Sequence, residues 1–168
     1  MKTGCGVVTL ILRDVEIEDL IKKPKYFFLE DLNRAKFRTQ DSHRKKEIHL
    51  RCNNSSGQFY LFWRQNTIDP LDFSVGLSYN FPDSNIKINL IRCNGNGHIH
   101  KNKLEGTKFD GEFHIHKATE RYQLLGLKAE NYAEKSTEFA DMEGAYKYIC
   151  RIAHIEEKRE GMMSLYEY

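Results

Sequence analysis

Short apolar segments separated by tight turns constrain the fold of this sequence more than any other feature. The alternating segments are 48–52, 58–64, 73–79 and 86–90, and turn residues occupy 53–57 and 82–85. Alternation of apolar and polar residues is typical of strands with one buried face. Turn residues between two such segments indicate a hairpin. The sequence therefore predicts a meander of antiparallel strands.

Two helices are expected at the ends of this meander. Residues 15–22 follow Asp14, a capping residue, and stop before Pro24. A longer helix is predicted from Thr137, because apolar residues recur at helical spacing as far as Ile152. The predicted fold class is α+β: a twisted antiparallel β-sheet meander, a short N-terminal helix and a C-terminal helix packed on one face. Further strands are predicted at 7–12, 26–29 and 112–117, with a charged loop at 101–111.

Length and composition indicate an ordinary globular protein. A chain of 168 residues fits one domain, predicted over 1–156 with a tail at 157–168. The net charge of +2 favours neither nucleic-acid binding nor its absence. The four cysteines have no metal-binding spacing, and reduced thiols are expected. No apolar run approaches the roughly 20 residues of a membrane span, so we expect a cytoplasmic protein without a membrane partner.

Two histidine doublets are the strongest functional signal. His98-Ile99-His100 and His114-Ile115-His116 contain four of the seven histidines. Residues two apart on a strand point to the same face, so each doublet presents two imidazoles. All four would converge if the two segments paired as a hairpin. Imidazole transfers protons near neutral pH and also ligates metals.

The residues around the doublets suit metal-free cleavage of RNA. One imidazole would take the proton of the 2′-hydroxyl and another would donate a proton to the leaving oxygen, while a cation stabilises the charge on phosphorus. The candidate catalytic residues are His100, His114, His116, Arg92, Arg121 and Asn102. Two alternatives stay open. Histidines on an exposed strand face need no function, and three imidazoles can hold zinc, although no cysteine or acidic residue stands at a diagnostic spacing.

A basic run is the second functional signal. Its candidate nucleic-acid-binding residues are Arg34, Lys36, Arg38, Arg44, Lys45, Lys46 and Arg51. Clustered cations beside an aromatic residue such as Phe37 can follow a phosphate backbone. The structural alternative is a solvated hairpin and an edge strand that lysines protect from aggregation.

The order of these motifs resembles a known pattern. The segment from Arg92 to Asn102, followed by the second doublet, is similar to an uncharacterised family of small bacterial proteins with an Arg…Gly…His-x-Asn…His-x-His pattern. More distantly, it resembles TumE-type toxins of toxin–antitoxin pairs. The resemblance singles out Arg92, Asn94, Asn96, His100, Asn102, His114 and His116. Asparagine at positions 94 and 96, where the pattern commonly has aspartate, argues against a metal.

These observations lead to two functional hypotheses. The first is a toxin-like or defence-related protein that acts on RNA or another phosphodiester as a metal-independent ribonuclease, without a cofactor and with an antitoxin as a possible partner. The second is a non-catalytic phage or mobile-element inhibitor that docks on a nuclease or nucleic acid through the basic run. The sequence leaves open which of the two applies.

Overall fold

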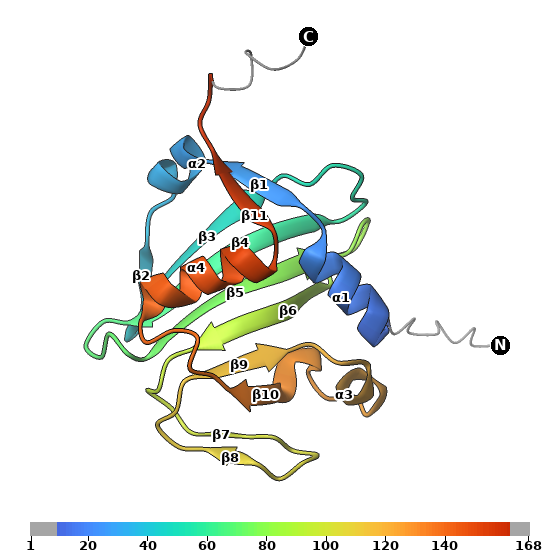
Figure 1. Cartoon of the computed structure of the whole chain (residues 1–168), viewed down its shortest axis with the longest axis vertical. Helices are drawn as coiled ribbons and strands as arrows, with labels where there is room; N and C mark the ends of the chain where they lie inside the picture. The colour runs from blue at the N-terminus through green and yellow to red at the C-terminus, as the bar shows by residue number, and fades with distance from the viewer. Residues whose placement is uncertain (1–9, 162–168) are drawn as a thin grey trace, which may run out of the picture.

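The computed structural model describes residues 10–161. Its centre is a seven-stranded sheet in the order β10-β9-β6-β5-β4-β3-β2, with all pairs antiparallel (Figure 1). The strands are β2 (Arg38–Gln40), β3 (His43–Leu50), β4 (Gln58–Asn66), β5 (Phe73–Asn80), β6 (Lys87–Asn94), β9 (His114–Lys117) and β10 (Tyr132–Lys135). From β2 to β6 each strand pairs with the next along the chain, which confirms the predicted meander.

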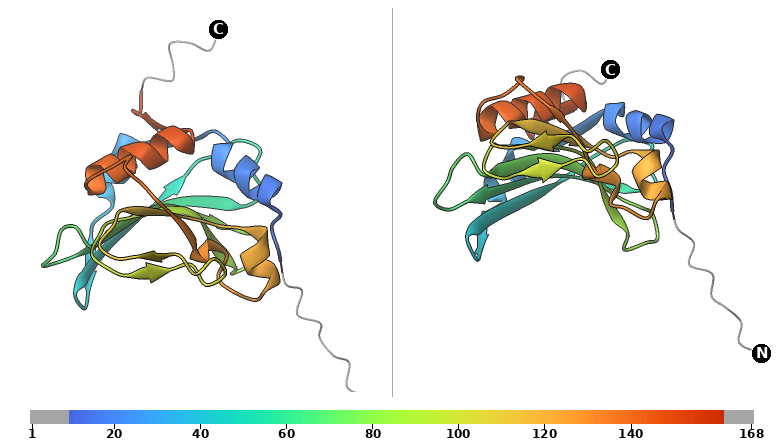
Figure 2. Two further views of the ribbon diagram at one scale, coloured as in Figure 1. Left: turned by 60° about the horizontal axis from the view of Figure 1, so that its bottom comes forward. Right: turned by 90° about the horizontal axis from the view of Figure 1, so that it is seen from below.

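Helices cover one face of this sheet. In both views of Figure 2, α1 (Asp14–Lys22) and α4 (Met142–Ile152) lie on the same side of the strands. Ala145 and Ile149 of α4 are fully buried in one core with Val75 and Leu77 of β5. The predicted α+β class, with a short N-terminal helix and a C-terminal helix on one face, is confirmed.

Smaller elements complete the fold. They are β1 (Lys25–Phe28), α2 (Leu29–Arg34), β7 (His100–Lys101), β8 (Lys108–Phe109), α3 (Glu120–Leu124), the 3-10 turn η1 (Ala129–Asn131) and β11 (Ile155–Lys158). Strand β1 pairs in parallel with β11, and β7 pairs with β8. Strand β11 continues two residues past the expected domain boundary at 156.

Three predicted elements differ from the structure. Helix α4 begins at Met142 rather than at Thr137, because the Asp141 carboxylate accepts a hydrogen bond from the Gly144 amide at 2.7 Å and caps the first turn there. Residues 10–12 form no strand, since the Leu12 backbone bonds the Gln123 side chain instead. The rest of that predicted strand, 7–9, lies outside the described residues. The predicted loop at 101–111 contains β8 and part of β7.

Two further properties concern the chain as a whole. Among residues 10–161, no helix is both long and apolar enough to cross a membrane. Cys52, Cys93 and Cys150 are free thiols, and Cys5 lies outside the described residues.

Candidate functional site

The four histidines of the two doublets converge, as the sequence suggested. The ring centres of His98 and His114 lie 5.2 Å apart, and those of His100 and His116 lie 4.4 Å apart. The doublets do not form a hairpin with each other. Strand β9 pairs with β6 and β10, while β7 pairs with β8, so the second doublet lies in the main sheet and the first lies beside it.

Strand register places the second doublet against two polar residues of β6. Arg92 is opposite His116, and Asn94 is opposite His114. Residues directly opposite across an antiparallel pair share one face of the sheet. His114 is 0% exposed and His116 is 2% exposed. These two histidines are therefore not surface residues of an exposed strand face.

Hydrogen bonds fix the orientation of both buried rings. His114 Nδ1 donates to the Glu112 carbonyl at 2.7 Å, and His116 Nδ1 donates to the Glu130 carbonyl at 2.8 Å. With the proton on Nδ1, Nε2 carries the lone pair. The Nε2 of His116 is buried and has no hydrogen-bond partner among the described residues. An unsatisfied buried acceptor of this kind calls for an explanation.

Burial keeps both imidazoles neutral at physiological pH. It lowers the pKa of His114 to about 4 and the pKa of His116 to about 2, and the positive charge of Arg92 lowers both further. Neither ring carries a second proton near pH 7. Both are therefore suited to offering a lone pair and poorly suited to donating a proton as a general acid.

His98 brings a third nitrogen to the same place. The candidate ligand atoms of His98, His114 and His116 all lie within 4.8 Å of one another. His98 Nδ1 lies 4.0 Å from the Asp72 carboxylate, which also bonds His43 and Arg64. A carbonyl or carboxylate behind the second ring nitrogen is the usual support of a metal-ligating histidine. These three residues have the arrangement of a metal site.

Asn94 stands among the three nitrogens. Its Nδ2 lies 3.0 Å from His98 Nε2 and 3.4 Å from His114 Nε2. Its Oδ1 is buried without a partner among the described residues. Rotation of the amide by about 180° exchanges the two atoms and directs Oδ1 toward the histidines. Asn94 can then serve as an oxygen ligand.

His100 lies beside the rings of His114 and His116, and Asn102 is hydrogen-bonded to it. His100 Nε2 bonds Asn102 Oδ1 at 3.1 Å and the Asn131 carbonyl at 3.0 Å, so this nitrogen is occupied. The Asn102 amide also donates to the Ala133 carbonyl and accepts from the Ala133 amide, both at 2.8 Å. Asn102 thus pairs with the edge of β10 as another strand would. It holds β7 in place.

The two candidate arginines have different surroundings. Arg92 is largely buried beside His116, and its Nε has no partner within residues 10–161. Arg121 on α3 pairs with Glu105 and stacks over the Tyr132 ring at 4.8 Å. Among the described contacts, none joins Arg121 to a histidine. The structure therefore brings Arg92 to the histidines and leaves Arg121 apart from them.

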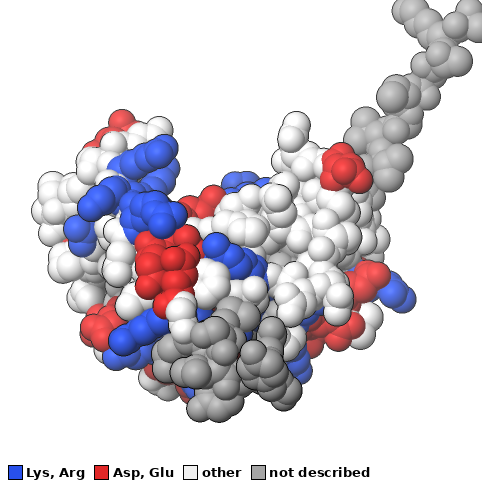
Figure 3. All heavy atoms as spheres, turned by 90° about the horizontal axis from the view of Figure 1, so that it is seen from above, with Lys and Arg blue, Asp and Glu red and all other residues white. Residues whose placement is uncertain are grey.

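Most of the basic run lines a hollow of about 890 Å³. Arg34, Lys36, Arg38, Lys45 and Lys46 line it, together with Arg64 and Lys87 from β4 and β6. Arg44 instead stacks on Phe37, and Arg51 pairs with Asp31. Figure 3 shows Lys and Arg gathered on one lobe of the surface, next to a group of Asp and Glu.

Several of these site residues could not be predicted from the sequence. Arg64 and Lys87 lie on other strands, and only the register of the meander brings them to the basic run. The sequence pattern places His98 in a doublet but does not distinguish it as a site residue. Asp72 immediately precedes the predicted strand 73–79, and no local pattern connects it to His98.

Comparisons with known proteins give a family but no function. No curated protein and no solved structure gives a significant match to the chain. The resemblance to TumE-type toxins therefore stays a prediction, as does a bacterial origin. The expectation of an uncharacterised family is confirmed: residues 12–155 match the Family of unknown function (DUF6978), and the chain belongs to that family.

Proposed function

We propose that this protein binds one divalent transition-metal ion through His98, His114 and His116 and acts on a phosphodiester beside it. The proposal rests on the positions of three imidazole rings. Three imidazoles place their candidate ligand atoms within 4.8 Å of one another, while the Nδ1 atoms of the two buried rings are held by carbonyl groups. Neutral imidazole suits zinc better than magnesium or calcium, which prefer oxygen ligands.

The ligand set leaves room for chemistry. Catalytic zinc sites typically have three protein ligands and a water molecule in the fourth position. Asn94 Oδ1 supplies a further oxygen ligand if its amide rotates. A zinc ion held by His98, His114 and His116 would supply a water nucleophile that is active near neutral pH.

Arg92 supports an anionic substrate. Its guanidinium stands opposite His116 across β6 and β9 and has an unpartnered Nε within the described part of the chain. A guanidinium binds phosphate oxygens through directed hydrogen bonds and stabilises the charge that develops on them. RNA or another phosphodiester fits a site that combines this cation with a metal.

Zinc titration tests the metal site directly. Calorimetry on chelator-treated protein should give one zinc ion per chain, and His98→Ala and His116→Ala should each weaken binding at least tenfold. His49→Ala is the matched control, because His49 is an exposed histidine of β3. Equal zinc affinity in all four proteins would contradict the proposal.

Cleavage of labelled RNA tests the reaction. We expect activity that chelator abolishes, that zinc or manganese restores and that His116→Ala lacks. Cleavage that persists in chelator and disappears in His116→Ala would instead support metal-independent acid–base catalysis by the histidines, as expected from the sequence alone.

The hollow favours a second candidate function. Seven Lys and Arg side chains around one hollow suit a protein that binds a nucleic acid or a nuclease without cleaving anything. RNA binding without cleavage by the zinc-loaded protein would favour this non-catalytic function. The toxin-like or defence-related setting stays a prediction for either candidate.

A further inference from the structure

We propose that a single-stranded nucleic acid binds along the open face of the sheet, from the hollow to the histidine site. The open face is the face opposite α4. Lys45 and Arg64 are accessible on it, whereas Ser74, Asn94 and His114 of the same face are buried. The histidine site reaches the surface at His98, whose side chain is 37% exposed. This inference deepens the proposed function by naming its substrate class. It rests on that function only for the chemistry at the histidine end.

The positive charge of the hollow favours a polyanionic ligand. The hollow is lined by seven Lys and Arg residues and by a single acidic residue, Glu47. Within residues 10–161, Lys36, Arg38 and Lys45 have no acidic partner. Burial lowers the pKa of Lys46, and the nearby charge of Lys36 lowers it further. A polyanion relieves this crowding, and its binding releases condensed counterions.

Strand register aligns one residue from each of five strands in a row between the hollow and the histidine site. Lys45 is opposite Arg64, and Arg64 is opposite Ser74. Ser74 is opposite Asn94, which is opposite His114. Four strand spacings of about 4.8 Å make this row about 19 Å long. Because Ser74 and Asn94 are buried, a chain of several nucleotides would cross above them and meet the histidine site at the partly exposed His98.

Arg64 connects the two ends of this row. It lines the hollow, and its guanidinium bonds the Asp72 carboxylate at 3.3 Å. The same carboxylate lies 4.0 Å from His98 Nδ1. Arg64 and Asp72 therefore connect the lining of the hollow to His98 through direct contacts.

An aromatic ring on the open face favours a single strand over a duplex. Phe62 lies opposite Gly76, which is opposite Arg92. A Cβ atom at Gly76 would lie 2.5 Å from the Phe62 ring, so only glycine lets this ring lie against β5. The half-buried ring lines the hollow. It can stack an unpaired base, whereas the bases of a duplex stack on one another.

Fluorescence anisotropy with a labelled RNA of about 16 uridines tests the proposal. The protein carries His116→Ala and the buffer contains chelator, so that neither cleavage nor a bound metal affects the result. Lys36→Glu with Lys45→Glu should raise the Kd at least tenfold and reduce the salt slope by about 0.7 per lost phosphate contact. Phe62→Leu should raise the Kd about fivefold, because it keeps an apolar side chain but removes the stacking face.

Lys147→Glu is the matched control, because Lys147 is an exposed residue of α4 on the other side of the sheet. It should leave the Kd unchanged. Unchanged affinity in the double variant would overturn the proposal. Competition by poly-glutamate equal to that by RNA would point to an acidic protein partner instead. Equal affinity for duplex RNA would overturn the single-strand assignment. Because the metal is absent throughout, failure of the metal site does not affect these outcomes.

Discussion

Lys25 is a lysine of the protein interior with a structural purpose. It is 2% exposed, and its Nζ donates to the carbonyls of Ile21 at 2.9 Å, Lys23 at 2.6 Å and Ala153 at 3.3 Å. These carbonyls lie at the C-terminal ends of α1 and α4, where a helix has no internal donors. Lys25→Met should lower the free energy of unfolding by about 2 kcal/mol. Urea denaturation measures this, and the exposed Lys22→Met is the control.

The same lysine predicts a dependence of stability on pH. Burial lowers its pKa from 10.5 to about 7 in the folded protein. Between these pH values the unfolded chain holds a proton that the folded chain has lost, so the unfolding free energy rises with pH. The stability advantage of the natural chain over Lys25→Met should therefore grow from about pH 7 to about pH 9. An advantage that is equal at the two pH values would contradict this interpretation.

The histidines could be found from sequence, but their environment could not. Residues two apart on a strand share a face whatever the partner strands are, and this places His114 and His116 of β9 together. His98 precedes β7 and lies in a bend, so strand geometry does not explain its place beside His114. Burial of His114 and the approach of Asp72 to His98 depend on which strands pair and how loops close over them. Asparagine at position 94 argued against a metal in the sequence. In the structure its amide lies beside two candidate ligand nitrogens.

Beside the contacts of Glu105 with Arg121 and Tyr122, the segment containing β7 and β8 is held to the sheet through Asn102. Its amide makes two hydrogen bonds with Ala133 of β10 and a third with His100. Asn102→Ala should therefore loosen residues 98–102, raise amide exchange there and weaken zinc binding at least tenfold through His98. Asn96→Ala is the control, because the described hydrogen bonds include none from the Asn96 side chain. Exchange and zinc affinity equal to those of the natural chain would show that Asn102 does not position β7.

Helices and strands were predictable from the sequence where the local pattern of apolar and polar residues determines them. Strand β5 alternates apolar residues with serine or glycine over residues 73–79, whereas β3 alternates only at its end, residues 48–50, after five polar residues. The turns that follow β3 and β5 have turn residues. Strand β11 has one buried apolar residue, Ile155, and owes its place to parallel pairing with β1, far away in the sequence. Helix α4 begins later than the apolar periodicity predicts, because the capping carboxylate of Asp141 fixes its first turn.

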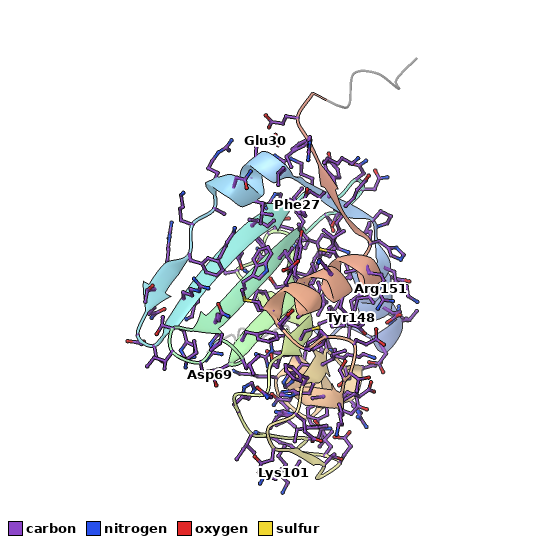
Figure 4. The ribbon with its side chains drawn as sticks, turned by 60° about the vertical axis from the view of Figure 1, so that its left-hand side comes forward. Phe27, Glu30, Asp69, Lys101, Tyr148 and Arg151 are labelled. Atoms are coloured by element: carbon purple, nitrogen blue, oxygen red, sulfur yellow. The ribbon has the colours of Figure 1, made fainter. Side chains whose placement is uncertain are left out.

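The two faces of the sheet carry different kinds of side chain. Side chains of β4 and β5 that point toward α4, such as Leu61 and Leu77, are fully buried. The opposite face carries the accessible cations Lys45 and Arg64 and, beside Phe109 of β8, the buried rings of His114 and His116. Figure 4 shows Lys101 of β7 at one end of the molecule and Glu30 of α2 at the other. The hollow begins beside α2 and the histidines lie toward β7, so the row of polar residues runs along much of the sheet.

This separation predicts how metal and folding are coupled. Because the apolar core lies on the α4 side of the sheet, the chain does not need a metal to bury it, unlike a zinc finger. Chelator-treated protein should keep its far-ultraviolet circular dichroism and unfold cooperatively. Zinc at about one hundred times its Kd adds about 2.7 kcal/mol and should raise Tm by about 5–10 °C. His116→Ala should fold but show no such rise. Loss of cooperative unfolding in chelator would instead make the histidine site part of the folding core.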